Sequence, residues 1–280
     1  MDAHHHLWDV EVRGYPFLAR RGLEPLRRTF GVGDFAAAAP GVTAGVVVQA
    51  VSSEAETVDL LAAAAGPGPV RAVVGWVDLT APDVADRIAA RRAGPGGSAL
   101  AGVRHQVEDE PDPSWLLRPD VLRGLAAVAE AGLVYDLLVK PPQYDAAIEA
   151  ARRLPELRIV LDHLGKPDVA GGMWRPWSGW IATLAALPNV AAKLSGLVTE
   201  DDWTGWTRER LVPYGRHALD AFGPDRVMYG SDWPVCTLAA DHATVTTLAE
   251  ATLTAFAPDD PTTHNTVFTT TAQTWYHLPP

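Results

Sequence analysis

The sequence predicts a single-domain (β/α)8 barrel, or TIM barrel, that includes residues 1–280. Short apolar segments alternate with helical segments along the whole chain, and no low-complexity block or linker divides it. The length suits this fold, since such barrels take about 250 residues as one domain. The apolar segments are rich in Val, Leu and Ile, which is typical of parallel strands buried on both faces. The eight predicted strands are residues 2–8, 44–51, 71–79, 100–106, 133–139, 158–164, 189–195 and 226–232.

The segments between these strands carry helix signals. In residues 52–65, Ser53 can accept a hydrogen bond from the amide of Glu56, whose side chain can reach back to form a capping box. Residues 81–92 carry Pro and Asp near their start and Arg at their end, which suits the helix dipole. Further helices are predicted at 34–39, 120–131, 143–153, 177–187, 207–221 and 239–256. A doubly wound open sheet is the alternative, but it would normally carry a Gly-rich phosphate turn after the first strand, and "HHHLWDVEVRG" is not one.

The composition excludes several classes of protein. A net charge of −11 argues against binding to the phosphate backbone of nucleic acids. No apolar run reaches the roughly 18 residues of a membrane span, and no basic segment followed by an apolar core indicates a secretory signal. The single Cys236 excludes an internal disulfide and a Cys-rich zinc module. We therefore expect a cytoplasmic protein that acts on a small molecule. The oligomeric state is left open, with a homo-oligomer among the alternatives.

Polar side chains collect where the predicted strands end. In a (β/α)8 barrel the active site lies at the carboxyl ends of the strands. Unpaired polar groups buried there would cost several kcal/mol each, so a shared polar site is the economical explanation. All three lysines lie in or just after a predicted strand end. The polar residues at these ends include Gln49, Asp78, Arg104, His105, Asp136, Lys140, Asp162, His163, Lys166, Lys193, Ser195, Ser231 and Asp232.

The first strand carries three consecutive histidines. Residues i and i+2 of a strand share a face, so His4 and His6 are expected to project together while His5 points towards the helices. Two imidazoles on one face can bind one cation, and His163 and Asp232 from other strands could complete its ligands. Asp232 could also deprotonate a metal-held water. The structural alternatives are a tag remnant for the histidines, a structural His163 and a turn cap at Asp232. One shared site explains all four residues more simply.

Seven segments together resemble the amidohydrolase superfamily, and within it the sugar-lactonase branch of L-fuconolactonases and L-rhamnonolactonases, with pyrone dicarboxylate lactonases more distant. The ordered series of motifs is specific, although H-x-H alone is weak. The resemblance extends from about residue 2 to about residue 277. The segments are "DAHHHLW", "VVGWVDL", "GVRHQVEDEPD", "YDLLVK", "VLDHLGKPD", "KLSGLVTE" and "YGSDWPV".

The resemblance implies a hydrolase that opens the ester ring of a lactone. By matching position, His4, His6 and His163 are the histidines of the site, and Asp232 is the expected general base that activates water. The fifth strand, "YDLLVK", lacks the histidine of two-metal members, so one divalent ion (Zn²⁺ or Mn²⁺) bound by these four residues is expected. Catalysis without a metal stays an alternative within this branch. A metal-dependent decarboxylase, or another amidohydrolase-type hydrolase acting on a small carboxylic acid, is the alternative activity.

Substrate contacts are expected from residues around these four. Arg104 of "GVRH" resembles a substrate-binding residue, and several aromatic side chains could form an apolar wall against the ring of the substrate. The remaining predicted substrate-binding residues are Tyr135, Lys193, Trp76, Trp233 and, as part of that wall, Trp174.

Overall fold

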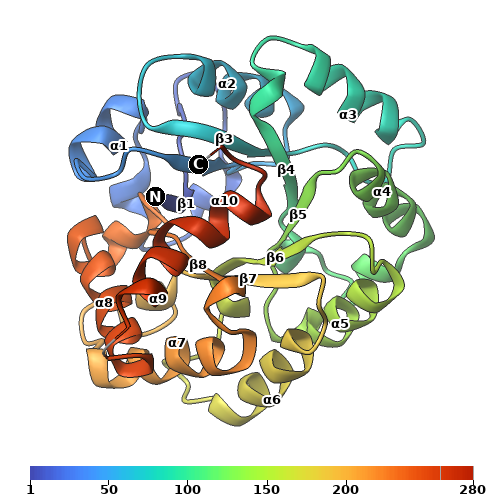
Figure 1. The fold of residues 1–280 in the computed structure, drawn as a ribbon. Helices are drawn as coiled ribbons and strands as arrows, with labels where there is room; N and C mark the ends of the chain where they lie inside the picture. The colour runs from blue at the N-terminus through green and yellow to red at the C-terminus, as the bar shows by residue number, and fades with distance from the viewer. Residues whose placement is uncertain (259, 280) are drawn as a thin grey trace.

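The computed structural model describes residues 1–258 and 260–279, which form a barrel of eight parallel strands surrounded by helices (Figure 1). Each strand pairs with the next in chain order. Backbone hydrogen bonds between the first and last strand segments, from Asp232 N to His4 O (2.8 Å) and from His6 N to Trp233 O (2.7 Å), join the two edges. The predicted (β/α)8 barrel is therefore confirmed. The strands are β1 (Asp2–His5), β2 (Gly45–Val48), β3 (Val70–Gly75), β4 (Leu100–His105), β5 (Val134–Leu137), β6 (Ile159–Leu161), β7 (Val190–Leu194) and β8 (Val227–Tyr229).

Several strands end earlier than predicted, and the residues beyond them form the site. The predicted strand 158–164 stops at Leu161, where the chain enters a 3₁₀ turn over Asp162–Gly165. The predicted strand 226–232 stops at Tyr229. In both cases burial continues past the last paired residue, although most of the residues that follow are polar. Periodicity alone therefore overestimates strand length here.

The predicted helices are confirmed, with ends shifted by up to three residues. Ser53 caps α2 by accepting a hydrogen bond from the amide of Glu56 (3.4 Å), as expected. Glu56 does not complete the capping box, because its carboxylate instead accepts hydrogen bonds from the amides of Ala50 and Val51. The principal helices are α1 (Val32–Ala38), α2 (Glu54–Ala65), α3 (Val84–Ala93), α4 (Pro119–Glu130), α5 (Tyr144–Arg153), α6 (Trp174–Ala185), α7 (Arg208–Phe222) and α8 (His242–Phe256).

Two short C-terminal helices were not predicted. They are α9 (Pro261–Asn265) and α10 (Thr271–Trp275), separated by a π-helical segment at Thr266–Thr270. Figure 1 shows α10 crossing the barrel near the first residue of the chain, away from the carboxyl ends of the strands. Trp275 and Tyr276 pack there against the small apolar side chains inside the barrel. The C-terminal segment therefore closes the amino-terminal end of the barrel.

Apolar side chains form two layers. The barrel interior holds small residues such as Ala3, Val46 and Ala191, whereas a larger layer separates the barrel from its helices. Within the described residues, no helix is both long enough and apolar enough to cross a bilayer. The solid interior leaves the carboxyl ends of the strands as the place for a polar site.

Candidate active site

The three histidines at the end of β1, of which His6 directly follows the strand, alternate in direction as in an extended chain. His4 and His6 point together, with 3.1 Å between their Nε2 atoms. His5 points the other way and stacks on Phe35 of α1, with ring centroids 3.8 Å apart. Burial lowers the pKa of His5 to about 3, so this ring is neutral and acts as a packing residue. The expected division of the triplet is confirmed.

Unusual backbone conformations turn His163 and Asp232 towards these rings. Both residues lie in the left-handed region, with φ of 52° for His163 and 58° for Asp232. Non-glycine residues adopt this region rarely, and such positions cluster at active sites. Gly196, with φ of 69°, lies behind His163, where a Cβ atom would come within 2.7 Å of the ring Nδ1. The "KLSG" motif after β7 thus provides the space that His163 occupies.

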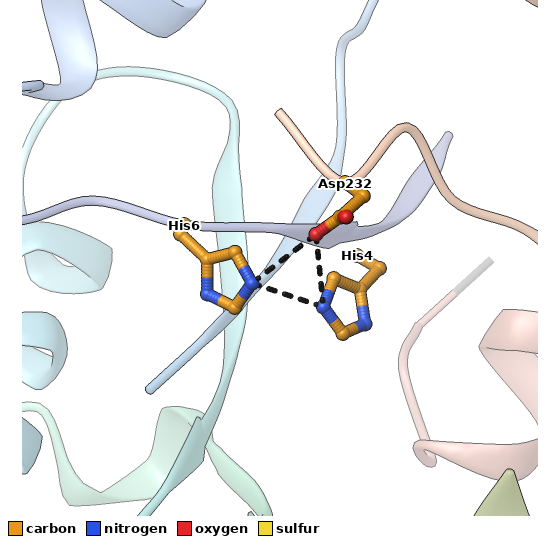
Figure 2. Close-up of side chains that lie close together, drawn as sticks. All are labelled: His4, His6 and Asp232. Atoms are coloured by element: carbon orange, nitrogen blue, oxygen red, sulfur yellow. Dashed lines mark hydrogen bonds and ion pairs between the residues drawn. The ribbon is translucent and has the colours of Figure 1, made fainter. Parts of the chain in front are cut away.

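Four donor atoms meet at the bottom of the site. Asp232 Oδ1 lies 3.4 Å from His6 Nε2, 3.7 Å from His4 Nε2 and 3.9 Å from His163 Nε2. Figure 2 shows this oxygen facing the rings of His4 and His6, while the second oxygen of Asp232 is turned away from them. All four side chains are buried. The structure therefore brings together the four residues that the sequence predicted as a metal site.

Hydrogen bonds at the far ring nitrogens orient the histidines. His6 Nδ1 lies 2.7 Å from Val48 O, a carbonyl that can only accept, so the proton resides on Nδ1 and the Nε2 lone pair faces the site. His4 Nδ1 lies 3.0 Å from Lys193 Nζ, its hydrogen-bond partner, and 3.2 Å from Asp162 Oδ1. His163 Nδ1 lies 2.9 Å from Ser195 Oγ. Partners at the far nitrogen orient metal-binding histidines, and at His6 the Val48 carbonyl also fixes the tautomer.

The protonation states suit ligand binding. Burial lowers the pKa of His163 to about 4 and, together with the positive charge of Lys193, brings the pKa of His4 well below its usual value. Burial acts to raise the pKa of Asp232, but the neighbouring His163 and His6 outweigh it, and the pKa is lowered. Neutral imidazoles beside an ionised carboxylate are the form in which these residues bind metal ions.

A cavity of about 290 Å³ opens above the donor atoms. His6, Arg104, His163 and Asp232 lie at its base, and His4 is fully buried. Its walls combine apolar side chains with charged ones at the rim. The wall residues include Trp8, Phe17, Leu23, Leu26, Leu138, Val235, Leu238, Arg20, Arg21, Gln106, Glu108, Asp109, Lys166, Glu200 and Trp203.

Of the predicted substrate-binding residues, only Arg104 lines this cavity. Its Nη1 donates to Asp162 Oδ2 (2.9 Å) and its Nη2 donates to Gln49 O, so the guanidinium is held in place. Lys193 is fully buried between Asp136 and Asp162, where a ligand in the cavity does not reach it. The prediction that Lys193 contacts substrate does not fit this position.

The predicted aromatic contacts also lie elsewhere. Tyr135 neighbours the inward-pointing Asp136 on β5, so its side chain faces the outer apolar layer. Trp233 is buried against Phe30 and Phe35, and Trp76 donates a hydrogen bond to His105. These three residues do not line the cavity. An aromatic residue near the end of a strand can face the cavity or the surrounding helices, and the sequence did not show which of these applies.

Trp174 lies on the outside of the barrel. It begins α6 and packs against Trp177, Tyr214 and His217, far from the histidine cluster in the fold. The apolar wall of the cavity is instead formed by Trp8, Phe17 and the leucines near them. The prediction for Trp174 is therefore wrong.

Comparison with known proteins places this architecture in a family. A family model described as an amidohydrolase matches residues 1–278. The chain belongs to the amidohydrolase family. It is 38% identical over 274 residues to an L-fucono-1,5-lactonase of Burkholderia multivorans, with 89% of this chain and 87% of that protein covered. It is 39% identical over 244 residues to an L-fucono-1,5-lactonase of Burkholderia ambifaria, with 85% and 81% covered.

A solved amidohydrolase structure supports the same assignment. The crystal structure of an amidohydrolase from Burkholderia multivorans with bound zinc superimposes with a TM-score of 0.93 at 36% identity and covers 99% of both chains. The family expected from the sequence motifs is confirmed.

The cavity of this amidohydrolase also contains residues that the sequence did not single out as site residues. Glu108 follows β4 and Glu200 follows β7, each at a short 3₁₀ turn, and both approach Lys166. Their acidic character within "GVRHQVEDEPD" and "KLSGLVTE" was visible, but nothing local indicated that the two loops meet. The feature that could have identified the two glutamates as site residues is that both follow barrel strands.

Proposed function

We propose that this amidohydrolase opens the ester ring of a sugar-acid lactone, with Asp232 as the base that activates water. The observation that carries the proposal is the cluster of three imidazoles and one carboxylate at the base of a cavity, in a chain 38% identical to an L-fucono-1,5-lactonase over most of its length. A lactone carbonyl needs an activated water on one side and charge stabilisation on the other. The cluster supplies both kinds of group.

The donor set fits one divalent ion. Ligand atoms about 2.0–2.1 Å from a tetrahedral ion lie roughly 3.4 Å apart. Three of the relevant distances here, from His4 Nε2 to His6 Nε2 and from Asp232 Oδ1 to each, are 3.1, 3.7 and 3.4 Å. When both Nε2 atoms are unprotonated, their lone pairs and the carboxylate repel one another unless a cation lies between them. A bound Zn²⁺ or Mn²⁺ would act as a Lewis acid towards the carbonyl oxygen and the attacking water.

The chain's own residues account for the proton transfers. Asp232 accepts a proton from the water as the water oxygen bonds to the lactone carbonyl carbon. When the ring C–O bond breaks, the ring oxygen leaves with the electron pair and takes the proton back from Asp232. The product carboxylic acid then ionises and acidifies the medium. Arg104, held by Asp162 and Gln49, is the cation that faces the substrate from the base of the cavity.

The activity is tested with a panel of lactones in a pH-indicator assay. The panel includes L-fucono-1,5-lactone and is run with chelator and with added Zn²⁺ or Mn²⁺. Acid release on a sugar-acid lactone is the expected result, and loss of rate with chelator would show a need for metal. Evolution of CO₂ from a carboxylic acid, with no acid release from any lactone, would contradict the proposal in favour of a decarboxylase.

The role of Asp232 is tested with Asp232→Asn. Loss of a general base costs about 10²–10⁴ in rate. Asp220→Asn, at an exposed ion pair with Arg216, is the matched control and should keep full activity. Zinc content of each variant is measured alongside, because Asp232 is also a donor atom. An Asp232→Asn variant with near-normal turnover would remove this residue from the mechanism.

We further propose that the enzyme acts in the cytoplasm, as expected from its charge and its single cysteine. A homo-oligomer stays a prediction, and light scattering of the purified protein tests it.

A further inference from the structure

The charged residues that line the cavity largely neutralise one another. Arg20 Nη2 lies 2.6 Å from Asp109 Oδ1, and Arg104 is held by Asp162. Lys166 Nζ lies 2.8 Å from Glu108 Oε2. The remaining lining cation, Arg21, is exposed at the rim. A negatively charged ligand would therefore find each deeper cation already matched to a carboxylate.

Lys166 is the cation that a ligand can reach on one side of the cavity. Its Nζ is flanked by Glu108 and, at 4.0 Å, by Glu200 Oε1. The three side chains come from three different loops, after β6, β4 and β7. The Lys166 and Glu200 side chains are each 24% exposed and Glu108 is 10% exposed, and all three line the cavity. We name Glu108, Lys166 and Glu200 the open triad.

The open triad has hydrogen-bonding capacity that the protein does not use. An ammonium carries three donor hydrogens, and each ionised carboxylate offers about four acceptor sites. Sugar hydroxyl groups donate and accept, so neighbouring hydroxyls can bind the ammonium and a carboxylate at once. A ligand carboxylate only accepts, and it would approach two like charges in a partly desolvated wall. The triad should therefore favour hydroxyl groups and disfavour carboxylates.

We propose that the open triad is the subsite that binds the hydroxyl groups of a neutral polyhydroxylated lactone and excludes lactones that carry a second acid group. The inference rests on the proposed function, because it assigns the substrate class of the same site. Glu108 and Glu200 act as specificity-determining residues: they occupy the ammonium of Lys166 and so withhold it from an anionic substrate. Specificity of this kind depends on a repulsive element as much as on an attractive one.

Binding of two unreactive sugars tests the subsite without any turnover. Galactose and galacturonate differ only in a hydroxymethyl group against a carboxylate, and calorimetry measures each dissociation constant. Burial, opposed by the charge of Lys166 and assisted by Glu108, raises the pKa of Glu200 to about 7, so the titrations are done near pH 8, about one unit above that value. Wild-type protein is expected to bind galactose at least about tenfold more tightly, the scale of one charge-assisted hydrogen bond.

The variants Glu108→Gln and Glu200→Gln should reduce this preference by roughly tenfold or more, because each frees Lys166 for a ligand carboxylate. Glu149→Gln, at an exposed ion pair with Arg153, is the matched control and should leave the preference unchanged. Equal binding of the two sugars by wild-type protein, or variants that behave like Glu149→Gln, would overturn the assignment.

Turnover of a lactone pair separates this inference from the proposed function. Galactonolactone and galactarolactone have the same configuration and differ, like galactose and galacturonate, in a hydroxymethyl group against a carboxylate. Hydrolysis of both at similar kcat/KM would refute the subsite while supporting lactonase activity. If neither is hydrolysed but galactose binding still depends on the two glutamates, the subsite stands and the activity fails.

Discussion

Two lysines in this barrel each lie between two carboxylates, at different depths. Lys193 Nζ is 2.5 Å from Asp136 Oδ2 and 3.1 Å from Asp162 Oδ1, and all three side chains are fully buried. We name these residues the buried triad. The open triad has the same charges, with Lys166 2.8 Å from Glu108 and 4.0 Å from Glu200, but it borders the cavity.

The difference shows that depth, and not composition, decides what such a triad can do. Every side of the buried triad is occupied by protein: Tyr276 OH donates to Asp136 Oδ1 (2.8 Å), Arg104 donates to Asp162, and His4 lies 3.0 Å from Lys193. Its hydrogen bonds therefore hold His4 at the donor cluster. The open triad retains free capacity on the cavity side, where only a ligand can use it.

Replacing the two lysines separates these roles most strongly. Lys193→Met leaves Asp136 and Asp162 buried without their cation and is expected to cost about 3–5 kcal/mol of the free energy of unfolding. Lys166→Met at the part-exposed triad should cost about 1 kcal/mol or less. Urea denaturation of both variants measures the difference. Similar losses for the two would show that depth does not distinguish the triads.

Removal of the Tyr276 hydroxyl group is expected to cause the next largest loss of stability. It bonds to both oxygens of Asp136, at 2.8 and 3.0 Å, and joins the C-terminal segment to the buried triad. Tyr276→Phe keeps the ring and removes a hydrogen bond to a charged group, which is worth about 1.5–3 kcal/mol. Chemical denaturation gives the loss, and Tyr144→Phe, whose hydroxyl donates to the neutral carbonyl of Gly165, is the control with a smaller expected loss. Equal losses of stability in Tyr276→Phe and Tyr144→Phe would show that the charge of Asp136 does not strengthen its hydrogen bond with Tyr276.

Asp162 provides a test in terms of metal binding. It is the carboxylate that faces His4 Nδ1, and partners of this kind typically change metal affinity by about 10–100-fold. Asp162→Asn should therefore weaken zinc binding by that factor, measured by competition with a chromophoric chelator. Glu200→Gln, in the open triad, should leave zinc affinity unchanged. If Glu200→Gln weakened zinc binding and Asp162→Asn did not, the buried triad would have no role in orienting the metal-binding histidines.

The barrel and the pairing of His4 with His6 could be predicted from the sequence because both depend on local periodicity. Alternation along β1 was sufficient to separate His4 and His6 from His5. The motifs around His163 and Asp232 then supplied the partners from distant strands. The left-handed backbone at both residues was not predicted, although it directs their side chains to the site.

The roles of the lysines could not be predicted in the same way. Both were expected in or just after a strand, but Lys193 lies within β7 and points into the barrel, whereas Lys166 follows the 3₁₀ turn after β6. The partner of Asp136, Tyr276, lies 140 residues away in a segment for which no helix was predicted. Contacts set by closure of the barrel and by loop geometry have no signature in local spacing.

The smallest expected effect concerns pH, and its sign differs between Glu200 of the open triad and Asp162 of the buried triad. Burial is the largest cause that raises the pKa of Glu200 to about 7, above roughly 4.3 in the unfolded chain. In the native state Glu200 therefore keeps its proton at pH values where the unfolded chain has lost it. The resulting contribution of Glu200 to the free energy of unfolding is fully present below about pH 4.3 and is lost as the pH rises through 7. At Asp162, burial is outweighed by Lys193 and His4, and the pKa lies well below its usual value.

The contribution of Asp162 is therefore present above its unfolded pKa of about 3.9 and is lost only in stronger acid. Burial raises the pKa of Asp136, in the buried triad, to about 6, so both triads respond between about pH 5 and 8, and comparison with Glu200→Gln isolates the contribution of the open triad. Wild-type protein is expected to lose stability relative to Glu200→Gln across that range, as followed by urea denaturation at several pH values. Parallel curves for the two proteins would mean that Glu200 is as well solvated in the native state as in the unfolded chain. Such a result would also remove the partial desolvation on which exclusion of a ligand carboxylate depends.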